Sequence, residues 1–462
     1  MTDLALPVDF REKIIAEIAA LAGRGESCSL VGVGSSGKSN VLRHLKRADV
    51  RIEYWKQAAP RILYLYVDCN KLPQYDEFDL YTRLLELLAE AAGQAGGALA
   101  ALQAPFDQAW EQSVQSASPL IAQHKLEQAL VQAFAQGAEQ VLVALDDCDP
   151  LILQSPAALR GLRALRDEHK YKLVYITATR LELWTIHPAH TPEFETFYEL
   201  LSAHTLAVPP YEPAEAEYML RRLVARVTPP GRPLYEDESR RIIQLSGGHA
   251  GLLKAIYSAT NDGEKALAPN LMDLLARNAE VWEECGKIWD SLEEQEQTTV
   301  AMIAQGKTPA EEGLRPLRRK GLVCPAPTGG VQLFTPLFAE YALGQASESE
   351  SGSAALFQED GTLTLDPGSK RLSINGRIVG PFPFAEFETL RYIYDRRPRV
   401  CNRHELLEHL KRMEAAALTR GTLLAEFVRI MKALRQQINL PGQEYLIQTP
   451  DGGYRLCADQ EL

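Results

Sequence analysis

Residues 29–39, SLVGVGSSGKS, decide how the rest of the chain is interpreted. From Gly32 onward they fit the pattern GxxxxGK(S/T) without a mismatch. A loop of this kind turns its backbone N–H groups towards bound phosphate, and glycines permit the dihedral angles that this needs. We expect Lys38 on the β- and γ-phosphates and the Ser39 hydroxyl on Mg²⁺. The alternative is a glycine-rich turn that binds nothing.

The segments on either side of this loop support the phosphate-binding interpretation. The apolar residues before it predict a strand, and residues 40–47 predict a helix whose positive N-terminus faces the phosphates. The residues expected to bind nucleotide here are Gly32, Gly34, Ser35, Ser36, Gly37, Lys38, Ser39 and Asn40.

Two carboxylates follow a second predicted strand, VLVALDD at residues 141–147. Acids at the carboxyl edge of a buried parallel strand lie where such sheets bind ligands. We expect Asp146 to hold Mg²⁺ and Asp147 to orient or deprotonate the attacking water. The alternative is that one of them only caps the helix that follows.

Three further strands are predicted at residues 62–67, 173–177 and 205–208, with helices between them. This alternation predicts a parallel sheet with helices on both faces. Arg180 follows the end of one of these strands, from where a guanidinium can stabilise charge on the γ-phosphate during transfer. The alternative is an arginine in a solvated loop.

The composition restricts the class of protein. The chain has 462 residues, which suggests roughly three domains, and a formal net charge of −12. Its seven cysteines are scattered and never spaced as CxxC, which is typical of free thiols in the cytoplasm. We expect neither a membrane span nor a secretory signal, and therefore a cytoplasmic protein.

Residues 213–259 have the pattern of helices, and Gly247-Gly248-His249 interrupts them. This tripeptide predicts either a loop that faces the nucleotide or a plain helix C-cap. In residues 282–343 helices precede a hairpin around two glycines, an order typical of a winged helix. Residues 344–360 are rich in serine and acids and predict a linker.

The last hundred residues form a separate pattern of short strands, three helices and a final hairpin. Turns are predicted at Asn375-Gly376 and at residues 451–453. Residues 362–462 contain 15 Lys and Arg against 12 Asp and Glu, so this module is mildly basic on an acidic chain. A surface that faces nucleic acid and a solvated helix face both remain compatible with this charge.

The first three-quarters of the chain resembles the STAND class of AAA+-related P-loop NTPases. The motifs that carry the resemblance are GVGSSGKS, VLVALDD, the strand-end Arg180, PPYEPAEA (residues 209–216) and SGGHAGLLK (residues 246–254). The resemblance implies ATP or ADP with Mg²⁺ as cofactors and Arg180 as the γ-phosphate sensor. It also implies Pro210 near the adenine and adds His249 to the candidate nucleotide contacts.

The C-terminal module is similar to the OmpR/PhoB-type winged helix. Residues 380–410 follow that family's central helices, and YLIQTPDGGYRL at residues 445–456 follows its wing. The resemblance implies DNA binding through residues 361–462. The basic residues expected on DNA are Arg403, Arg429, Lys432, Arg435 and Arg455.

The sequence thus predicts a multidomain α/β protein. Its expected parts are a P-loop NTPase core (1–208), a helical lid (209–278), a winged helix (279–343), a linker (344–360) and an OmpR-type winged helix (361–462). We expect an ATP-dependent switch and slow ATPase that controls DNA binding, most simply a prokaryotic transcription regulator, with an unknown signal or protein partner and nucleotide-dependent self-association. The alternatives are an origin-recognition-like initiator ATPase, a defence or signalling NTPase whose last module binds protein, and a nucleotide-locked scaffold.

Overall fold

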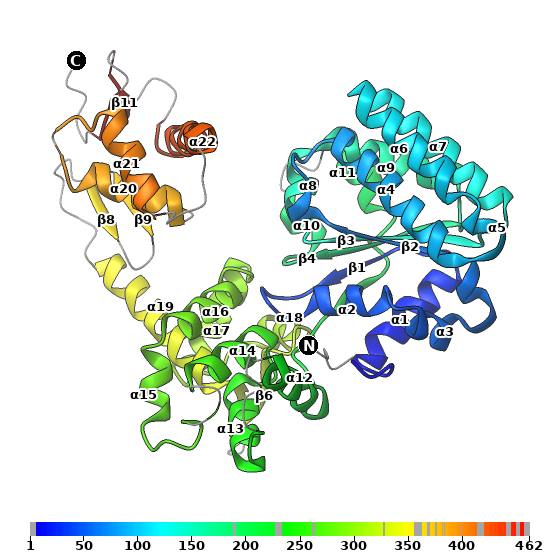
Figure 1. Ribbon diagram of the computed structural model, residues 1–462. Coiled ribbons are helices and arrows are strands. Elements are labelled where there is room, and N and C mark those ends of the chain that lie inside the picture. Colours follow the sequence, from blue (N-terminus) through cyan, green and yellow to red (C-terminus); the bar gives the residue numbers. More distant parts are fainter. Residues whose placement is uncertain are drawn as a thin grey trace. The chain divides into compact units, whose positions relative to one another are not determined.

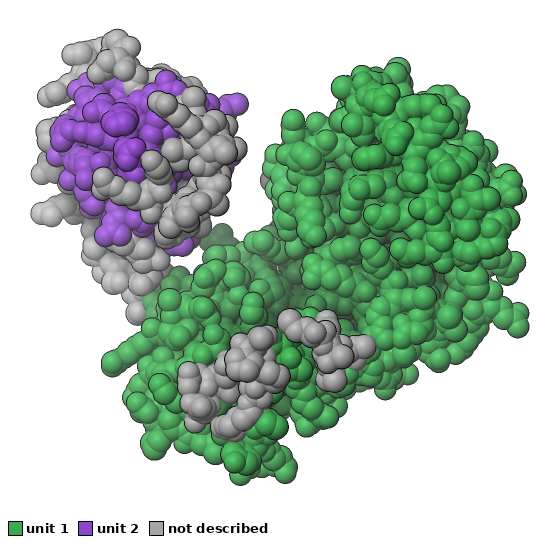
Figure 2. Space-filling view, viewed as in Figure 1, with its two compact units in different colours: residues 1–347 green, residues 348–462 purple. Residues whose placement is uncertain are grey.

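The computed structural model contains two compact units, Met1–Ser347 and Glu348–Leu462 (Figure 2). The residues that it describes are 6–187, 191–226, 233–260, 263, 265–326, 329–354, 363–366, 370–374, 377–380, 382, 384–397, 399–413, 420–439, 445–449 and 453–456.

A five-stranded sheet in the order β2-β3-β4-β1-β5 forms the centre of the core, and all of its strand pairs are parallel (Figure 1). The strands are β1 (Cys28–Val31), β2 (Ile62–Asp68), β3 (Gln140–Asp146), β4 (Leu173–Thr179) and β5 (Thr205–Ala207). Parallel strands end at the same edge, so the loop after β1 and the acids at the end of β3 emerge together with only β4 between them. This confirms the expected parallel sheet.

Helices cover both faces of the sheet, as predicted (Figure 1). One face packs against α4 (Glu77–Ala95), α6 (Gln103–Ser116), α7 (Pro119–Ala135), α9 (Pro156–Glu168) and α11 (Pro192–Tyr198). The other face packs against α1 (Glu12–Gly23), α2 (Lys38–Leu45) and α3 (Ala48–Trp55). Alternate residues of β3 serve the two cores: Val143 lies in the first and Leu142 in the second. The shorter elements are η1 (Lys56–Arg61), η2 (Cys69–Lys71), α5 (Gly97–Ala100), α8 (Asp149–Gln154) and α10 (Leu183–Ile186).

The rest of the first unit is helical and has one shared hydrophobic core. The part that we call the lid, after the sequence prediction for residues 209–278, contains α12 (Pro213–Arg226), α13 (Glu236–Ser246), α14 (Ala250–Ala259) and α15 (Leu271–Ala276). What we call the hairpin module contains α16 (Ala279–Trp289), α17 (Glu294–Ala304), α18 (Glu311–Arg319) and the antiparallel pair β6 (Val323–Pro325) and β7 (Val331–Leu333). The helix α19 (Pro336–Ala354) follows.

The second unit has its own core, to which both its helices and its strands contribute. Its sheet, in the order β10-β9-β8, is formed by β8 (Leu363–Asp366), β9 (Arg371–Ile374) and β10 (Arg377–Val379). The helices α20 (Phe384–Tyr394), α21 (Arg403–Met413) and α22 (Arg420–Ile438) precede the antiparallel pair β11 (Leu446–Gln448) and β12 (Tyr454–Leu456). The turn predicted at residues 375–376 and most of the turn predicted at 451–453 lie outside the described residues.

Helices α6 and α19 are among the places where the structure differs from the expected elements. Helix α6 was not predicted, because its short apolar stripe buries little more than Phe106 and gives a weak periodic signal. Helix α19 continues to Ala354, so residues 344–354 of the expected linker are helical. Among the described residues, no helix is both long and apolar enough to cross a membrane.

Candidate nucleotide-binding site

The phosphate loop connects the fully buried strand β1 to helix α2, as the sequence predicts. Ser35 and Gly37 both have positive φ values, 56° and 99°. A side chain at Gly37 would approach the Tyr211 hydroxyl to 2.8 Å, so the loop needs glycine there for space as well as for conformation. The buried Ser36 hydroxyl has no hydrogen-bond partner, which fits a loop built to receive a polar ligand.

Lys38 lies almost completely buried at the start of α2. Its Nζ atom donates to the carbonyl oxygens of Gly32 (2.6 Å) and Val33 (3.2 Å), which belong to the same loop. Burial lowers the pKa of Lys38 to about 8, although the nearby carboxylates of Asp147 and Asp149 act in the opposite direction. A buried cation whose partners are only carbonyl oxygens is well placed to bind phosphate.

Asp146 is the last residue of β3, and its carboxylate accepts hydrogen bonds from two hydroxyl groups. Ser39 Oγ donates to one carboxylate oxygen at 3.1 Å, and the Tyr66 hydroxyl donates to the other at 2.5 Å. Burial raises the pKa of Asp146. A serine hydroxyl beside one carboxylate is the donor set that a nucleotide-bound Mg²⁺ uses, because phosphates and water complete its shell. The described residues contain no cluster of three or more His, Cys, Asp or Glu side chains that would bind a metal alone.

Asp147 and Arg180 come from neighbouring strand ends. Asp147 has a φ of 49°, and its carboxylate accepts a hydrogen bond from Asn70 Nδ2 at 3.1 Å. Arg180 has an exposed side chain, and its positive charge contributes to the lowered pKa of Lys38. The structure therefore brings Lys38, Asp146, Asp147 and Arg180 to one edge of the sheet.

Three residues of this site were missed by the sequence reasoning. Tyr66 and Asn70 lie on β2 and η2, and nothing in the sequence indicates which carboxylates they bind. Asp149 begins α8, accepts the Arg180 backbone N–H at 3.2 Å, and has a pKa that burial raises. A signal for Asp149 was available, because LDDCD places a third acid one residue beyond the pair, after Cys148.

His249 and Tyr211 hold the loop from the side of the lid. The His249 Nδ1 atom accepts the Leu252 N–H, so the Nε2 atom carries the proton and donates to Gly34 O at 2.9 Å. Burial lowers the pKa of His249 to about 4, and the ring is therefore neutral at pH 7. The C-cap interpretation of this segment is confirmed, because Gly247 is the left-handed C-cap of α13. A role for His249 towards nucleotide stays a prediction. Asn40 Nδ2 donates to the Tyr211 hydroxyl at 2.7 Å.

Pro210 lines a cavity of about 500 Å³ between the N-terminal segment and the lid. Arg11, which is buried, donates to Pro209 O at 2.5 Å and to Pro210 O at 3.2 Å. Phe10 and Tyr218 add aromatic lining. Six of its thirteen lining residues are charged, so the cavity combines aromatic walls with a strongly polar rim.

The basic residues expected on DNA lie in the second unit. Arg429 and Lys432 are exposed on α22, and Arg429 Nη1 pairs with the buried Glu386 at 3.2 Å. Arg403 and Arg435 both lie close enough to Tyr454 to lower its pKa, against the rise that burial causes. Arg455 lies on β12. The structure thus brings Arg403 and Arg435 near the final strand pair.

Three arginines of helix α9, Arg160, Arg163 and Arg166, all have partners within the chain. Arg160 pairs with Glu193 (2.8 Å), Arg163 with Asp167 (2.9 Å), and Arg166 donates to Gly25 O (2.7 Å).

Comparisons with known proteins give likenesses of structure only. No family model and no curated protein matches the chain. The ORC2 protein of Aeropyrum pernix, solved as ADPNP and ADP complexes, aligns at 16% identity and a TM-score of 0.41, over 76% of this chain and 97% of that chain. A Walker-type ATPase of Pyrococcus abyssi aligns at 14% and 0.44, over 72% and 95%. The Aeropyrum pernix ORC1 protein, solved in complex with DNA, aligns at 16% and 0.37, over 76% and 95%.

Proposed function

We propose that this chain is an ATP-dependent molecular switch. One observation carries the proposal: the Ser39 hydroxyl lies 3.1 Å from the Asp146 carboxylate, directly after the buried Lys38. Neither a glycine-rich turn nor a helix cap requires these three groups to converge, whereas binding of a nucleotide triphosphate with Mg²⁺ requires all of them.

Each residue has a defined role in this proposal. Lys38 leaves the loop carbonyls and pairs with the β- and γ-phosphates. Ser39 and Asp146 hold Mg²⁺, which neutralises phosphate charge when bound. Asp147, held by Asn70, orients the attacking water, and Arg180 stabilises charge on the γ-phosphate. The cavity beside Pro210 receives the adenine.

Hydrolysis by purified protein tests the proposal. We expect slow multiple-turnover release of phosphate from ATP that requires Mg²⁺. Lys38→Ala should abolish ATP binding, and Asp147→Asn should retain binding but lower turnover by about 10²-fold or more, since it removes the group that positions water. The matched control is Lys46→Ala, because Lys46 is the exposed C-cap of the same helix. Turnover that Lys38→Ala leaves unchanged would refute the assignment.

The output of the switch is proposed to be DNA binding through the second unit, whose exposed basic residues include Arg429 and Lys432. Two specific roles suit such a switch. The initiator-like role draws on the core, the lid and the hairpin module, all of which pack together in the first unit. The transcription-regulator role depends entirely on the second unit, so we place the initiator-like role first.

A single binding experiment separates these roles. Purified protein is offered its own upstream DNA, origin DNA and random DNA, with ATP, with ADP and without nucleotide, over a salt series. Preference for origin DNA supports the initiator-like role, and preference for upstream DNA supports the regulator. A steep salt dependence without sequence preference leaves only attraction to phosphate. No binding at low salt favours a defence or signalling ATPase whose last unit binds protein.

A further inference from the structure

The phosphate loop is packed into the hairpin module as well as into the core. Val33, in the middle of the loop, is 1% exposed and belongs to the hydrophobic core that the lid and the hairpin module share. A loop that only waited for phosphate would not need to place an apolar side chain in another part of the protein. Movement of this loop therefore disturbs the hydrophobic core that the lid and the hairpin module share.

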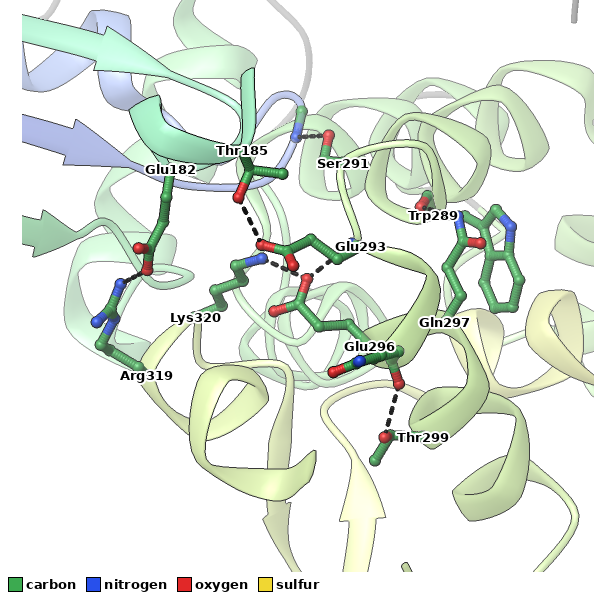
Figure 3. Close-up of polar contacts among 12 residues, drawn as sticks. Glu182, Thr185, Trp289, Ser291, Glu293, Glu296, Gln297, Thr299, Arg319 and Lys320 are labelled. Carbon is green, nitrogen blue, oxygen red and sulfur yellow. Dashed lines mark hydrogen bonds and ion pairs between the residues drawn. The ribbon is translucent and has the colours of Figure 1, made fainter. Parts of the chain in front are cut away.

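The next residue, Gly34, is held by the end of α16 and the turn that follows (Figure 3). Its backbone N–H donates to the Ser291 hydroxyl at 2.8 Å, and Ser291 in turn donates to Lys287 O at 2.6 Å. A side chain at Gly34 would lie 2.9 Å from Lys287 O, so only glycine permits this approach. Ser291 is itself 1% exposed, which keeps water from competing for the contact.

A second contact joins the hairpin module to the segment that follows Arg180 (Figure 3). Thr185 Oγ1 donates to Glu293 Oε1 at 3.0 Å, and Arg319 forms an ion pair with Glu182. The hairpin module thus touches both the phosphate loop and the segment that directly follows Arg180.

A buried ion pair inside the hairpin module fixes the residues that make these contacts. Lys320 Nζ lies 2.6 Å from Glu296 Oε2, and both side chains are at most 6% exposed. The same Glu296 oxygen accepts the Glu293 backbone N–H at 2.9 Å (Figure 3). Because Arg319 precedes Lys320 directly, one pair positions both Glu293 and Arg319.

We propose that Ser291 is a residue of the nucleotide site, supplied from outside the core, and that docking of the hairpin module opposes nucleotide binding. In the docked arrangement the Gly34 N–H donates its hydrogen bond to the Ser291 hydroxyl, and Lys38 Nζ donates to a carbonyl oxygen of the loop. Phosphate needs the loop's own donors, so phosphate and docking favour different arrangements of the same atoms. Coupling of this kind is reciprocal, and nucleotide therefore loosens the module. The inference rests on the proposed function.

Two sets of variants test this inference in the full chain. Ser291→Ala removes the hydroxyl from Gly34, and Thr298→Ala is the matched control, because the Thr298 hydroxyl bonds only Glu294 O within its own helix. Glu182→Arg and Arg319→Glu each break the ion pair of the second contact, and the double variant restores that pair with exchanged charges. The readouts are the dissociation constants of ATP and ADP with Mg²⁺ and hydrogen exchange of the phosphate loop without nucleotide.

We expect Ser291→Ala to tighten nucleotide binding by roughly 2- to 10-fold, the worth of one hydrogen bond, and to speed exchange in the loop. Glu182→Arg and Arg319→Glu should tighten binding too, and the exchanged pair should return it towards wild type. Weaker or unchanged nucleotide binding in these variants would overturn the inference. Wild-type protein that binds no nucleotide would instead refute the proposed function, and the exchange measurement would still decide whether Ser291 restrains the loop.

Discussion

Replacement of Lys38 by methionine should make the nucleotide-free protein more stable at pH 7, even though it abolishes nucleotide binding. Lys38 is only 5% exposed, and the partners of its amine are carbonyl oxygens of Gly32 and Val33 rather than a carboxylate. Burial of the charge therefore disfavours the folded state, and a methionine of similar length removes that penalty.

The magnitude follows from the lowered pKa. A fall of the Lys38 pKa from 10.5 to about 8 means that the buried charge lowers the unfolding free energy of wild type at pH 7 by about 3 kcal/mol. The Lys38→Met variant also loses two hydrogen bonds to carbonyl oxygens, and each loss lowers its unfolding free energy by about 1 kcal/mol. The variant should therefore be more stable than wild type by about 1 kcal/mol at pH 7.

The difference should reverse as the pH rises. Between pH 8 and 10.5 the folded protein releases the Lys38 proton while the unfolded chain keeps it. The unfolded state then binds more protons, so the unfolding free energy of wild type rises with pH relative to that of the variant. By pH 10.5 wild type should be the more stable protein, by about 2 kcal/mol.

Urea unfolding at several pH values between 7 and 10.5, without nucleotide, measures this difference. Other titrating groups are common to both proteins and cancel in the comparison. Lys46→Met, which changes an exposed lysine of the same helix, should show no such reversal. A difference between wild type and Lys38→Met that stays constant with pH would refute the reasoning.

Three further changes test other contacts. Tyr66→Phe removes the hydroxyl that donates to Asp146. It should raise the Mg²⁺ concentration that gives half-maximal ATP turnover about tenfold, without changing the affinity for metal-free ATP. An unchanged Mg²⁺ dependence would contradict this. Lys320→Met leaves the Glu296 charge buried without its cation, and should lower the unfolding free energy measured in urea by about 3–5 kcal/mol. Glu296→Gln combined with Lys320→Met should lower the unfolding free energy far less. Equal decreases in the two variants would assign the effect to packing. Lys432→Ala should reduce the slope of log DNA affinity against log salt by about 1, and an unaltered slope would remove Lys432 from the interface.

The core could be predicted because its signals are local. The glycines of the phosphate loop, the apolar run before Asp146 and the alternation of strands and helices each report their own structure, and the sheet brings them to one edge. The DNA-binding assignment remains a prediction, because it depends on a resemblance and on charge rather than on a geometric constellation.

The contacts that control the site could not be predicted. Ser291 lies 257 residues from Gly34 in the sequence, and its neighbours DSLEE suggest only a helix start. Tyr66 is one of two tyrosines in an apolar strand, and nothing local distinguishes the one that binds a carboxylate. Such pairs form only through tertiary packing, which periodicity does not encode.

The burial of Val33 among helices of the lid and hairpin module has a practical consequence for dissecting this protein. A truncated chain that ends after β5, at the boundary which the sequence suggests, would expose this side chain to water and leave the Gly34 N–H without Ser291. Such a fragment would present a phosphate loop with different energetics from the native one. A chimera that takes its lid and hairpin module from another protein would need a compatible residue at position 33. A fragment designed for study should therefore end after the hairpin module and not before the lid.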